Sequence, residues 1–207
     1  MDITQEIQKN FIIDADKEDE SIEESKCIKR LGDIVLEEEV GRGAFAIVYR
    51  GYSNSGQQFA VKEIPKSLLN EKLIASLQKE VSILATLNCE HIVRLYNVVT
   101  TSKHFNLIME FCNGGDLRKK LKPFVRIEEF VVQKIIHQVS KGLKVLHQNR
   151  VIHRDLKLSN LLLVYDKDGT YKAKIADFGF ATILARDQDA QTFCGTAPNM
   201  APEVLEG

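Results

Sequence analysis

The sequence predicts an α+β protein of two lobes, in which a β-rich half with one helix precedes a largely helical half. Runs rich in β-branched residues alternate with glycine- and asparagine-containing turns between residues 34 and 64. One segment with leucines at helical spacing follows, and a wider apolar stripe at helical spacing begins near residue 131. The 207 residues suffice for one large domain or two small ones.

Each element of the β-rich half follows from a local pattern. Turns at residues 41–44 and 53–56 separate three short apolar runs, which is typical of an antiparallel meander. The strands are expected at Ile34–Val40, Ala46–Tyr52, Gln58–Ile64, Ile92–Thr100 and Phe105–Phe111. The helix is expected where leucines recur three or four residues apart, at Leu69, Leu73, Leu77, Leu84 and Leu87.

The second half is expected to be organised around one long helix. Its apolar positions between Val131 and Leu146 form a stripe wide enough to be buried against a core. A later apolar run, ending in Ile175-Ala176, is expected to be a strand.

Composition excludes several classes of protein. With 44% hydrophobic and 28% charged residues, the chain is neither disordered throughout nor fibrous. The net charge of −1 provides no overall field for nucleic acid, and apolar runs of about five residues are far too short for a membrane span. Four scattered cysteines and an N-terminus without signal-peptide features indicate a reduced, cytoplasmic protein. Residues 1–32 are expected to form an acidic, flexible extension, either simply solvated or docking on a basic partner.

Two features of the β-rich half can hold an anionic ligand. Residues 41–46 form a turn in which glycines let backbone N–H groups approach phosphate, although a plain hairpin turn explains the string equally well. Lys62 stands within an apolar strand, either facing solvent on an edge or partly buried beside an anion. Glu80 shares a helical face with leucines and is the candidate partner, unless it is an ordinary surface glutamate.

A dense polar cluster is expected in the second half. Asp155 is followed by a cation, Lys157, two residues later and by an amide, Asn160, five residues later. Such groups can orient a hydroxyl, neutralise phosphate and ligate a metal ion. Asp177 follows a strand end and stands beside a phenylalanine and a glycine. Each string alone is an ordinary loop, but their occurrence in this order is not expected by chance.

With these motifs in this order, the chain from about residue 34 to its end resembles the eukaryotic protein kinase family. The resemblance implies transfer of the ATP γ-phosphate to Ser/Thr hydroxyls of a protein substrate, mainly through positioning and charge neutralisation. By resemblance, Asp155 orients the substrate hydroxyl and Lys157 steadies the transferred phosphoryl group. Lys62, which holds the α- and β-phosphates, and Glu80 complete the catalytic set.

The resemblance also assigns the ligand-binding residues. Mg²⁺ would be held by Asn160 and Asp177. ATP would be held by Val40, Gly41, Arg42, Gly43, Ala44, Phe45, Ala46, Val48, Ala60, Lys62, Glu110, Cys112, Asp116 and Leu162.

Short strings narrow the resemblance. Asp155-Leu156-Lys157 is similar to the Ser/Thr branch of the family, and the strings at residues 111–117 and 177–181 are most similar to the autophagy-initiating, unc-51-like kinases. The resemblance further implies a switch, in which a phosphate on Thr192 pairs with Arg154 and orders the segment after Asp177.

The chain ends at Gly207, soon after the Ala-Pro-Glu string at residues 201–203. The family normally continues with further helices, so we expect an incomplete helical lobe that leaves part of its apolar stripe exposed, with either poor solubility or recruitment of a protein partner. Two other interpretations stay open: a non-catalytic module that binds nucleotide or docks on another kinase, and a gene fragment without a folded product.

Overall fold

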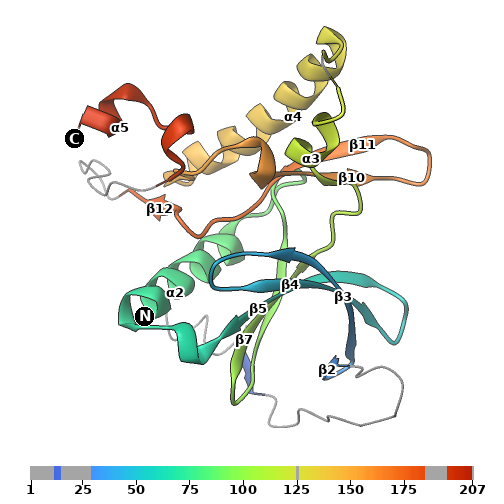
Figure 1. The fold of residues 1–207 in the computed structure, drawn as a ribbon, viewed down its shortest axis with the longest axis vertical. Coiled ribbons are helices and arrows are strands. Elements are labelled where there is room, and N and C mark those ends of the chain that lie inside the picture. Colours follow the sequence, from blue (N-terminus) through green and yellow to red (C-terminus); the bar gives the residue numbers. More distant parts are fainter. Residues whose placement is uncertain (1–11, 15–28, 125, 185–194, 207) are drawn as a thin grey trace. The chain divides into compact units, whose positions relative to one another are not determined.

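The computed structural model describes residues 12–14, 29–124, 126–184 and 195–206, and the chain divides into two compact units (Figure 1). The first unit comprises residues 1–74 and 95–111, and the second comprises residues 75–94 and 112–207. The first is built on a β-sheet and the second contains most of the helical residues, so the predicted α+β class is confirmed.

The first unit is a seven-stranded sheet with the strand order β1-β6-β7-β5-β4-β3-β2. Its strands are β1 (Ile12–Asp14), β2 (Lys29–Leu31), β3 (Ile34–Arg42), β4 (Ile47–Ser53), β5 (Gln58–Pro65), β6 (Leu95–Thr100) and β7 (His104–Glu110). A short 3-10 helix, η1 (Lys66–Leu68), follows β5. Five of these strands, β3 to β7, were predicted. Apolar runs bounded by turn residues indicate the two-residue period of a strand and not the period of a helix.

The two outermost strands fall in the segment predicted as a flexible extension. At one edge β1 pairs in parallel with β6, and at the other β2 pairs antiparallel with β3. The structure therefore differs from the prediction at these six residues, and Leu31 is buried in the core. Residues 1–11 and 15–28 lie outside the described residues, so for them the extension stays a prediction.

One buried cluster of the first unit lies on one face of its sheet. The central strands contribute Val61 and Ile108, which face each other across β5 and β7. Leu31, Ile34, Leu36 and Val99 complete the buried cluster, and Tyr49 and Phe59 pack against it. Residues directly opposite each other in neighbouring strands share a face, so the residues between them in sequence project to the other side.

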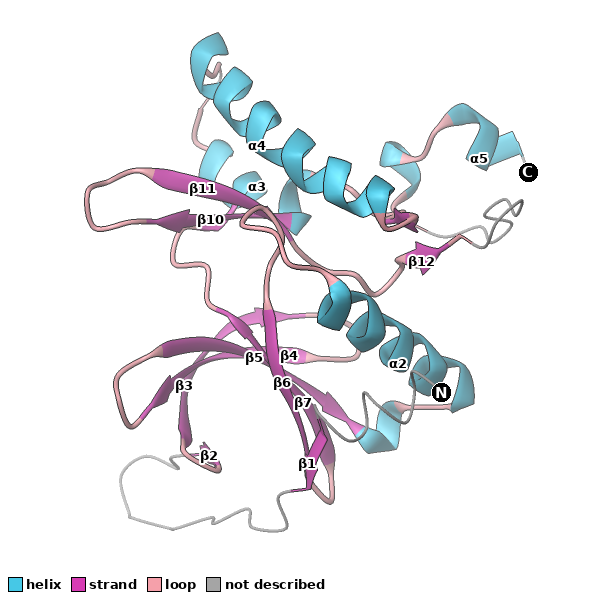
Figure 2. Cartoon of the chain, turned by 180° about the vertical axis from the view of Figure 1, so that it is seen from behind, coloured by secondary structure: helices cyan, strands magenta, loops and turns pink. Residues whose placement is uncertain are grey.

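Short strands accompany the helices of the second unit (Figure 2). The helices are α2 (Glu71–Thr86, whose first residues belong to the first unit), α3 (Leu117–Leu121), α4 (Glu129–Gln148) and α5 (Pro202–Glu206), with 3-10 turns η2 (Leu158–Asn160) and η3 (Ala197–Asn199). One sheet has the order β11-β10-β8 and another pairs β12 with β9. These strands are β8 (Gly115–Asp116), β9 (Val151–Ile152), β10 (Leu161–Tyr165), β11 (Tyr171–Ile175) and β12 (Thr182–Ile183).

The segment before β6 is paired elsewhere, which explains why β6 is shorter than predicted. The backbone carbonyl of His91 accepts a hydrogen bond from the Ile175 amide at 2.8 Å, and the Val93 amide donates to the Ile175 carbonyl at 2.9 Å. Ile92 therefore forms a bridge beside β11 instead of beginning β6. This pairing fixes the end of β11, the strand that precedes Asp177.

The long helix α4 is buried over part of its length only. Val139, Gly142 and Leu146 are buried, whereas Phe130 and Ile136 are 60% and 61% exposed. The stripe predicted between Val131 and Leu146 is therefore buried at Val139 and Leu146 and exposed at Ile136, so it is covered over part of its length only. Within the described residues, none of the helices combines the length and apolar character needed to cross a membrane.

Candidate active site

Asp155 is the centre of a buried polar cluster in the second unit. Its side chain is almost fully buried, and each carboxylate oxygen has a partner. The Thr196 hydroxyl donates to Oδ1 at 2.5 Å, and the Asn160 amide donates to Oδ2 at 3.0 Å. The Lys157 ammonium lies 2.8 Å from Oδ2 and donates to the Thr196 hydroxyl at 2.7 Å. The predicted catalytic residues Asp155 and Lys157 are thus in direct contact.

The contacts around Asp155 hold it in its charged form. Burial alone would raise the pKa of Asp155, but the hydrogen bonds from Lys157 and Thr196, the charge of Lys157 and the bond from Asn160 outweigh it, so the pKa lies below its ordinary value. Ionised Asp155 therefore stabilises the fold above the pH at which an unfolded aspartate titrates, about 3.9, and this contribution is lost as the pH falls through the lowered value. At neutral pH this carboxylate is ready to accept a hydrogen bond from a hydroxyl.

Asn160 connects this cluster to the strand that follows. Its amide nitrogen also donates to the Asp155 carbonyl at 2.9 Å, and its backbone carbonyl accepts from the Ala176 amide at 2.9 Å. Because the amide nitrogen is engaged twice, the side-chain oxygen is the group left to ligate a cation. An amide oxygen and the exposed carboxylate of Asp177 fit Mg²⁺, which prefers oxygen ligands and shares them with water and phosphate. Among the described residues, no group of three or more His, Cys, Asp or Glu side chains is arranged so that it could hold a metal ion.

His153 holds the two chain segments of the site together. Its Nε2–H donates to the Ala176 carbonyl at 3.0 Å, and its Nδ1 accepts from the Asp155 amide at 3.3 Å. Its ring packs edge-on against Phe178 at a centroid distance of 4.9 Å. This arrangement requires the neutral imidazole, because a protonated Nδ1 could not accept from Asp155.

Acidification is expected to destabilise the chain through His153. Burial lowers the pKa of His153 below its ordinary value, against the raising influence of the Ala176 hydrogen bond and the charges of Asp177 and Asp155. The unfolded chain takes up this proton as the pH falls through about 6.5, whereas the folded chain does not, so the free energy of unfolding falls with pH below that point. Denaturant unfolding at a series of pH values should show this slope in the wild type, weaker in His153→Gln and unchanged in a variant of the exposed His137, His137→Gln. An equal slope in all three proteins would contradict it.

The segment from Asp177 to Thr182 is fixed to α2. Asp177 adopts a left-handed backbone conformation with φ +63°, which directs the buried Phe178 inward and leaves the carboxylate exposed. The Ser76 hydroxyl donates to the Gly179 carbonyl at 3.1 Å, and the Lys79 ammonium donates to Thr182 at 2.5 Å. Both partners come from the helix that carries Glu80.

Glu80 is buried on α2, with only 5% of its surface exposed, so the alternative of a surface glutamate is excluded. A methyl group added at Gly179 would lie 3.8 Å from Glu80 Oε2 and 3.5 Å from Asp177 Oδ1. The two carboxylates therefore converge on the same turn of the chain. Two such groups in one place favour a cationic partner.

Gly195 brings the last part of the described chain onto the cluster. Its φ of +119° is accessible to glycine alone without strain, and an added Cβ would collide with the Arg154 carbonyl. This close approach places Thr196 between Asp155 and Lys157.

Lys62 and its neighbours occupy the face of the first unit's sheet opposite the buried cluster of that sheet. Val48 lies opposite Lys62 on β4, and Leu107 lies opposite it on β7. Ala60 lies opposite Met109 on the same face, and Val48, Ala60, Lys62 and Met109 are all half-buried. Because β5 is an internal strand, the alternative of a solvent-facing edge lysine is excluded. This face presents small apolar side chains around one ammonium group.

The glycine-bearing loop is a hairpin turn that does not need its glycines. The Gly43 amide donates to the Ala46 carbonyl at 2.8 Å, closing a four-residue loop between β3 and β4. Neither Gly41 nor Gly43 has a positive φ, and added Cβ atoms would meet their nearest neighbours at 3.8 and 3.7 Å, which is ordinary contact. The turn itself therefore does not require glycine at these two positions. A ligand that approaches the backbone closely would explain why glycine is present.

The other predicted nucleotide-binding residues around this loop are exposed or half-buried. Val40 is the extra residue of a β-bulge in β3 and is 38% exposed. Arg42 forms an ion pair with Glu39, and Ala44 and Phe45 are exposed at the tip of the loop.

The remaining predicted residues lie at the end of β7 in the first unit and on or next to the sheet of the second unit. Glu110 is the last residue of β7 and Cys112 is buried. Asp116 caps α3 through a 2.8 Å hydrogen bond from the Lys119 amide and lies opposite Leu162 in the β8–β10 pair. Leu162 and Asp116 therefore share a face of the second unit's sheet.

Of the two residues of the predicted phosphate switch, the structure describes Arg154. Arg154 has a φ of +63° and its Nε donates to the Phe180 carbonyl at 2.6 Å. Thr192 lies outside the described residues, so the pairing of its phosphate with Arg154 stays a prediction.

The structure adds residues to which the motifs gave no role. His153 joins the segments of Asp155 and Asp177, and Lys79 and Ser76 hold the turn after Asp177. His153 belongs to the same string as Asp155 and could have been singled out from it. The contacts of Lys79 and Ser76 join residues more than a hundred positions apart, and no local pattern signals them.

Comparison with known proteins agrees with this geometry. Residues 34–207 match the family model of the protein kinase domain. The chain is 42% identical over 176 residues to the serine/threonine-protein kinase ATG1a of Arabidopsis thaliana, covering 84% of this chain and 28% of that protein. It is 40% identical over 185 residues to the serine/threonine-protein kinase atg1 of Dictyostelium discoideum, covering 86% and 28%, and 36% identical over 216 residues to ATG1 of Komagataella pastoris, covering 86% and 27%. The chain thus spans just over a quarter of the length of these relatives.

The family match covers both the sheet that carries Lys62 and the cluster around Asp155. The chain therefore belongs to the protein kinase family.

Proposed function

We propose that the chain is a protein serine/threonine kinase that transfers the γ-phosphate of ATP to Ser/Thr hydroxyls of a protein substrate. The observation that carries this proposal is the buried, ionised Asp155, held by Lys157, Thr196 and Asn160. The names of the ATG1 relatives support the Ser/Thr specificity, and we extend to this chain a cytoplasmic role in autophagy initiation.

Asp155 orients the attacking hydroxyl and accepts its proton. As the hydroxyl oxygen bonds to the γ-phosphorus, the bond between that phosphorus and the oxygen bridging to the β-phosphate breaks, and ADP leaves. Lys157, 2.8 Å from Asp155, offers its charge to the phosphoryl group in transit. Asn160 and Asp177 would hold Mg²⁺, which neutralises phosphate charge when bound. The protein's own contribution is thus mainly fixed charge and position.

The first unit is proposed to hold the nucleotide. Lys62 would pair with the phosphates, the backbone of residues 41–46 would approach them, and Val48 and Ala60 would contact the base. Glu110 of the first unit and Cys112, Asp116 and Leu162 of the second unit are further residues that we propose to bind nucleotide.

The proposal is tested by transfer of label from γ-labelled ATP to a mixture of Ser- and Thr-containing peptides. Transfer is expected with Mg²⁺ and should stop when the metal is chelated. Bound nucleotide without transfer would instead indicate a non-catalytic nucleotide-binding module and would overturn the kinase assignment.

Gly43→Ala is expected to weaken ATP binding about tenfold without changing the unfolding temperature. The added methyl group meets only ordinary contacts within the protein, but it would obstruct a phosphate that approaches the amide, losing one charge-assisted hydrogen bond of about 1.5 kcal/mol. Isothermal titration and thermal unfolding measure the two effects. The matched control is Gly169→Ala in the β10–β11 turn, where φ is +82°, which should destabilise the fold by about 1 kcal/mol and leave ATP binding intact. Unchanged ATP affinity in Gly43→Ala would refute the phosphate role of this loop.

A further inference from the structure

One surface of the second unit is positively charged, although the net charge of the whole chain is close to zero. Between residues 118 and 134 there are six cations and two carboxylates, Glu128 and Glu129, a local net charge of +4. The cations are all exposed: Arg118, Lys119, Lys120, Lys122, Arg126 and Lys134. They lie on α3, on the connection after it and on the first turns of α4.

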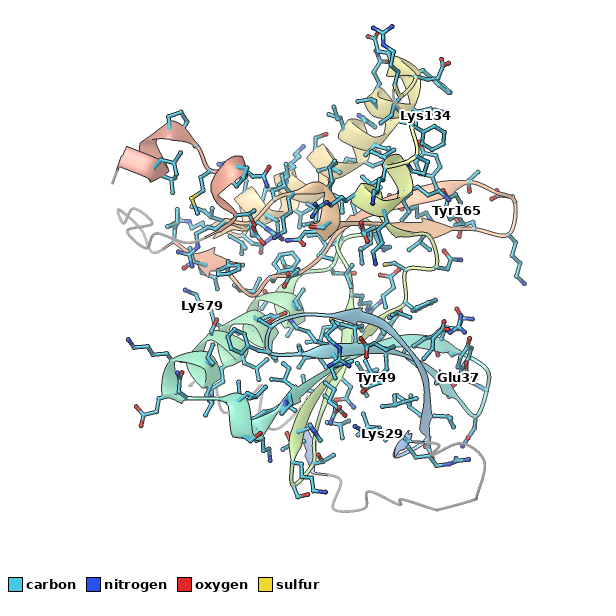
Figure 3. All side chains as sticks on the ribbon, in the orientation of Figure 1. Lys29, Glu37, Tyr49, Lys79, Lys134 and Tyr165 are labelled. Atoms are coloured by element: carbon cyan, nitrogen blue, oxygen red, sulfur yellow. The ribbon has the colours of Figure 1, made fainter. Side chains whose placement is uncertain are left out.

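Large apolar side chains are exposed among these cations. Phe124 is 62% exposed, Phe130 is 60% exposed and Ile127 is 37% exposed. We call these three residues and the six cations the basic aromatic tip. In both views the N-terminal end of α4 projects beyond α3 and the β10–β11 hairpin, and Lys134 lies at this end (Figures 1, 2 and 3).

Contacts within the chain leave most of this charge available. Lys119 is 3.6 Å from Asp116, yet its side chain is 80% exposed. Lys120 lies over the Tyr165 ring, 5.2 Å from its centroid. Arg118, Lys122 and Arg126 make no ion pair with any residue that the structure describes. A local cationic field in which Lys119 alone has a carboxylate partner among the described residues favours an anionic ligand.

We propose that the basic aromatic tip binds the surface of an anionic membrane. Lysines and arginines around exposed phenylalanines have the composition of an interfacial binding surface, in which the cations meet lipid headgroups and the aromatic rings enter the headgroup–acyl boundary. The proposed contact is peripheral.

Other anionic partners fit this surface less well. The tip projects from the unit, so a flat lipid surface can contact it, and four of its six cations are lysines, whereas acidic peptide motifs are typically recognised by clusters of arginines. Single-stranded nucleic acid stacks its bases on open aromatic faces, but the Lys134 ammonium lies over the Phe130 ring at 4.1 Å and occupies one face. The proposal is independent of the catalytic function, because no residue of the tip belongs to the Asp155 cluster.

Co-sedimentation with phosphatidylcholine vesicles, with and without phosphatidylserine, tests the proposal on the purified chain. The wild type should sediment with the anionic vesicles and not with the neutral ones, and added salt should release it. Lys119→Glu combined with Lys122→Glu should lower partitioning by more than about thirtyfold, since loss of each lysine's charge near an anionic surface alone costs roughly a factor of five and each new glutamate is repelled. Phe124→Ser combined with Phe130→Ser should lower it about tenfold through lost apolar burial.

The matched control is Lys141→Glu combined with Lys144→Glu, which makes the same charge change at exposed positions farther along α4. It should bind vesicles nearly as well as the wild type, and thermal unfolding should show all variants folded. An equal loss in the control, or no preference for anionic vesicles, would overturn the proposal. Tighter binding of the wild type to poly-glutamate or single-stranded RNA than to the vesicles would also overturn it.

Discussion

Asp155→Asn is expected to lower the rate of phosphoryl transfer by about 10²–10⁴-fold while ATP affinity stays within a factor of about two. The amide keeps the shape of the side chain but cannot accept the substrate proton. It also carries no charge for Lys157, 2.8 Å away, and cannot accept through both of its ends from Thr196 and Asn160. The rate of label transfer from ATP and the ATP dissociation constant measure the two effects separately.

The matched control is Asp166→Asn, which makes the same change in the exposed β10–β11 turn, where Asp166 pairs with Lys172. This variant should retain wild-type transfer. Loss of ATP binding together with transfer in Asp155→Asn would indicate a structural defect, and full transfer would exclude Asp155 from the reaction.

Lys62→Met is expected to reduce kcat/KM for ATP by about 10²–10³-fold, the usual effect of removing one fixed charge that stabilises the transition state. Methionine has a similar length and an apolar stem, so it should fit the half-buried site between Val48 and Leu107. The free energy of unfolding should therefore change little. Steady-state kinetics over a range of ATP concentrations, together with denaturant unfolding, measure both quantities.

Lys103→Met provides the control, because Lys103 is exposed in the turn between β6 and β7. Its kinetics should match those of the wild type. If Lys62→Met kept wild-type kcat/KM, the half-buried ammonium would have no part in holding phosphate.

Local patterns predicted the sheet well because alternation and turn residues act over a few positions. Whether Lys62 faces solvent or a partly buried site was left open by its strand, and the pairing of β5 with β4 and β7 decides for the buried site. Patterns of this kind do not report pairing between distant segments. The parallel pairing of β1 with β6 and the bridge from Ile92 to β11 could not be predicted for that reason.

How far each part of α4 is buried could not be predicted from its apolar spacing alone. Helical spacing identifies which residues share a stripe but not whether another element covers it, and Phe130 and Ile136 are exposed. The same limit applies to charge. The net charge of −1 gave no indication of the basic aromatic tip, because acidic residues elsewhere in the sequence offset its +4.

For the candidate site, the motifs identified residue types and order, and the structure supplies the contacts. The hydrogen bonds from Thr196 to Asp155 and from His153 to Ala176 join residues separated by 41 and 23 positions. Their effect on the protonation of Asp155 and His153 depends on burial and distance, which the sequence does not contain. The roles of these residues in catalysis stay predictions that the variants above test.

The most direct measurement is identification of the phosphorylated residue after the chain is incubated with γ-labelled ATP, Mg²⁺ and a peptide mixture offering serine, threonine and tyrosine hydroxyls. Label is expected on phosphoserine and phosphothreonine, dependent on Asp155 and abolished by chelation of the metal. Saturable ATP binding with no label on any hydroxyl, or label that persists in Asp155→Asn, would contradict the account.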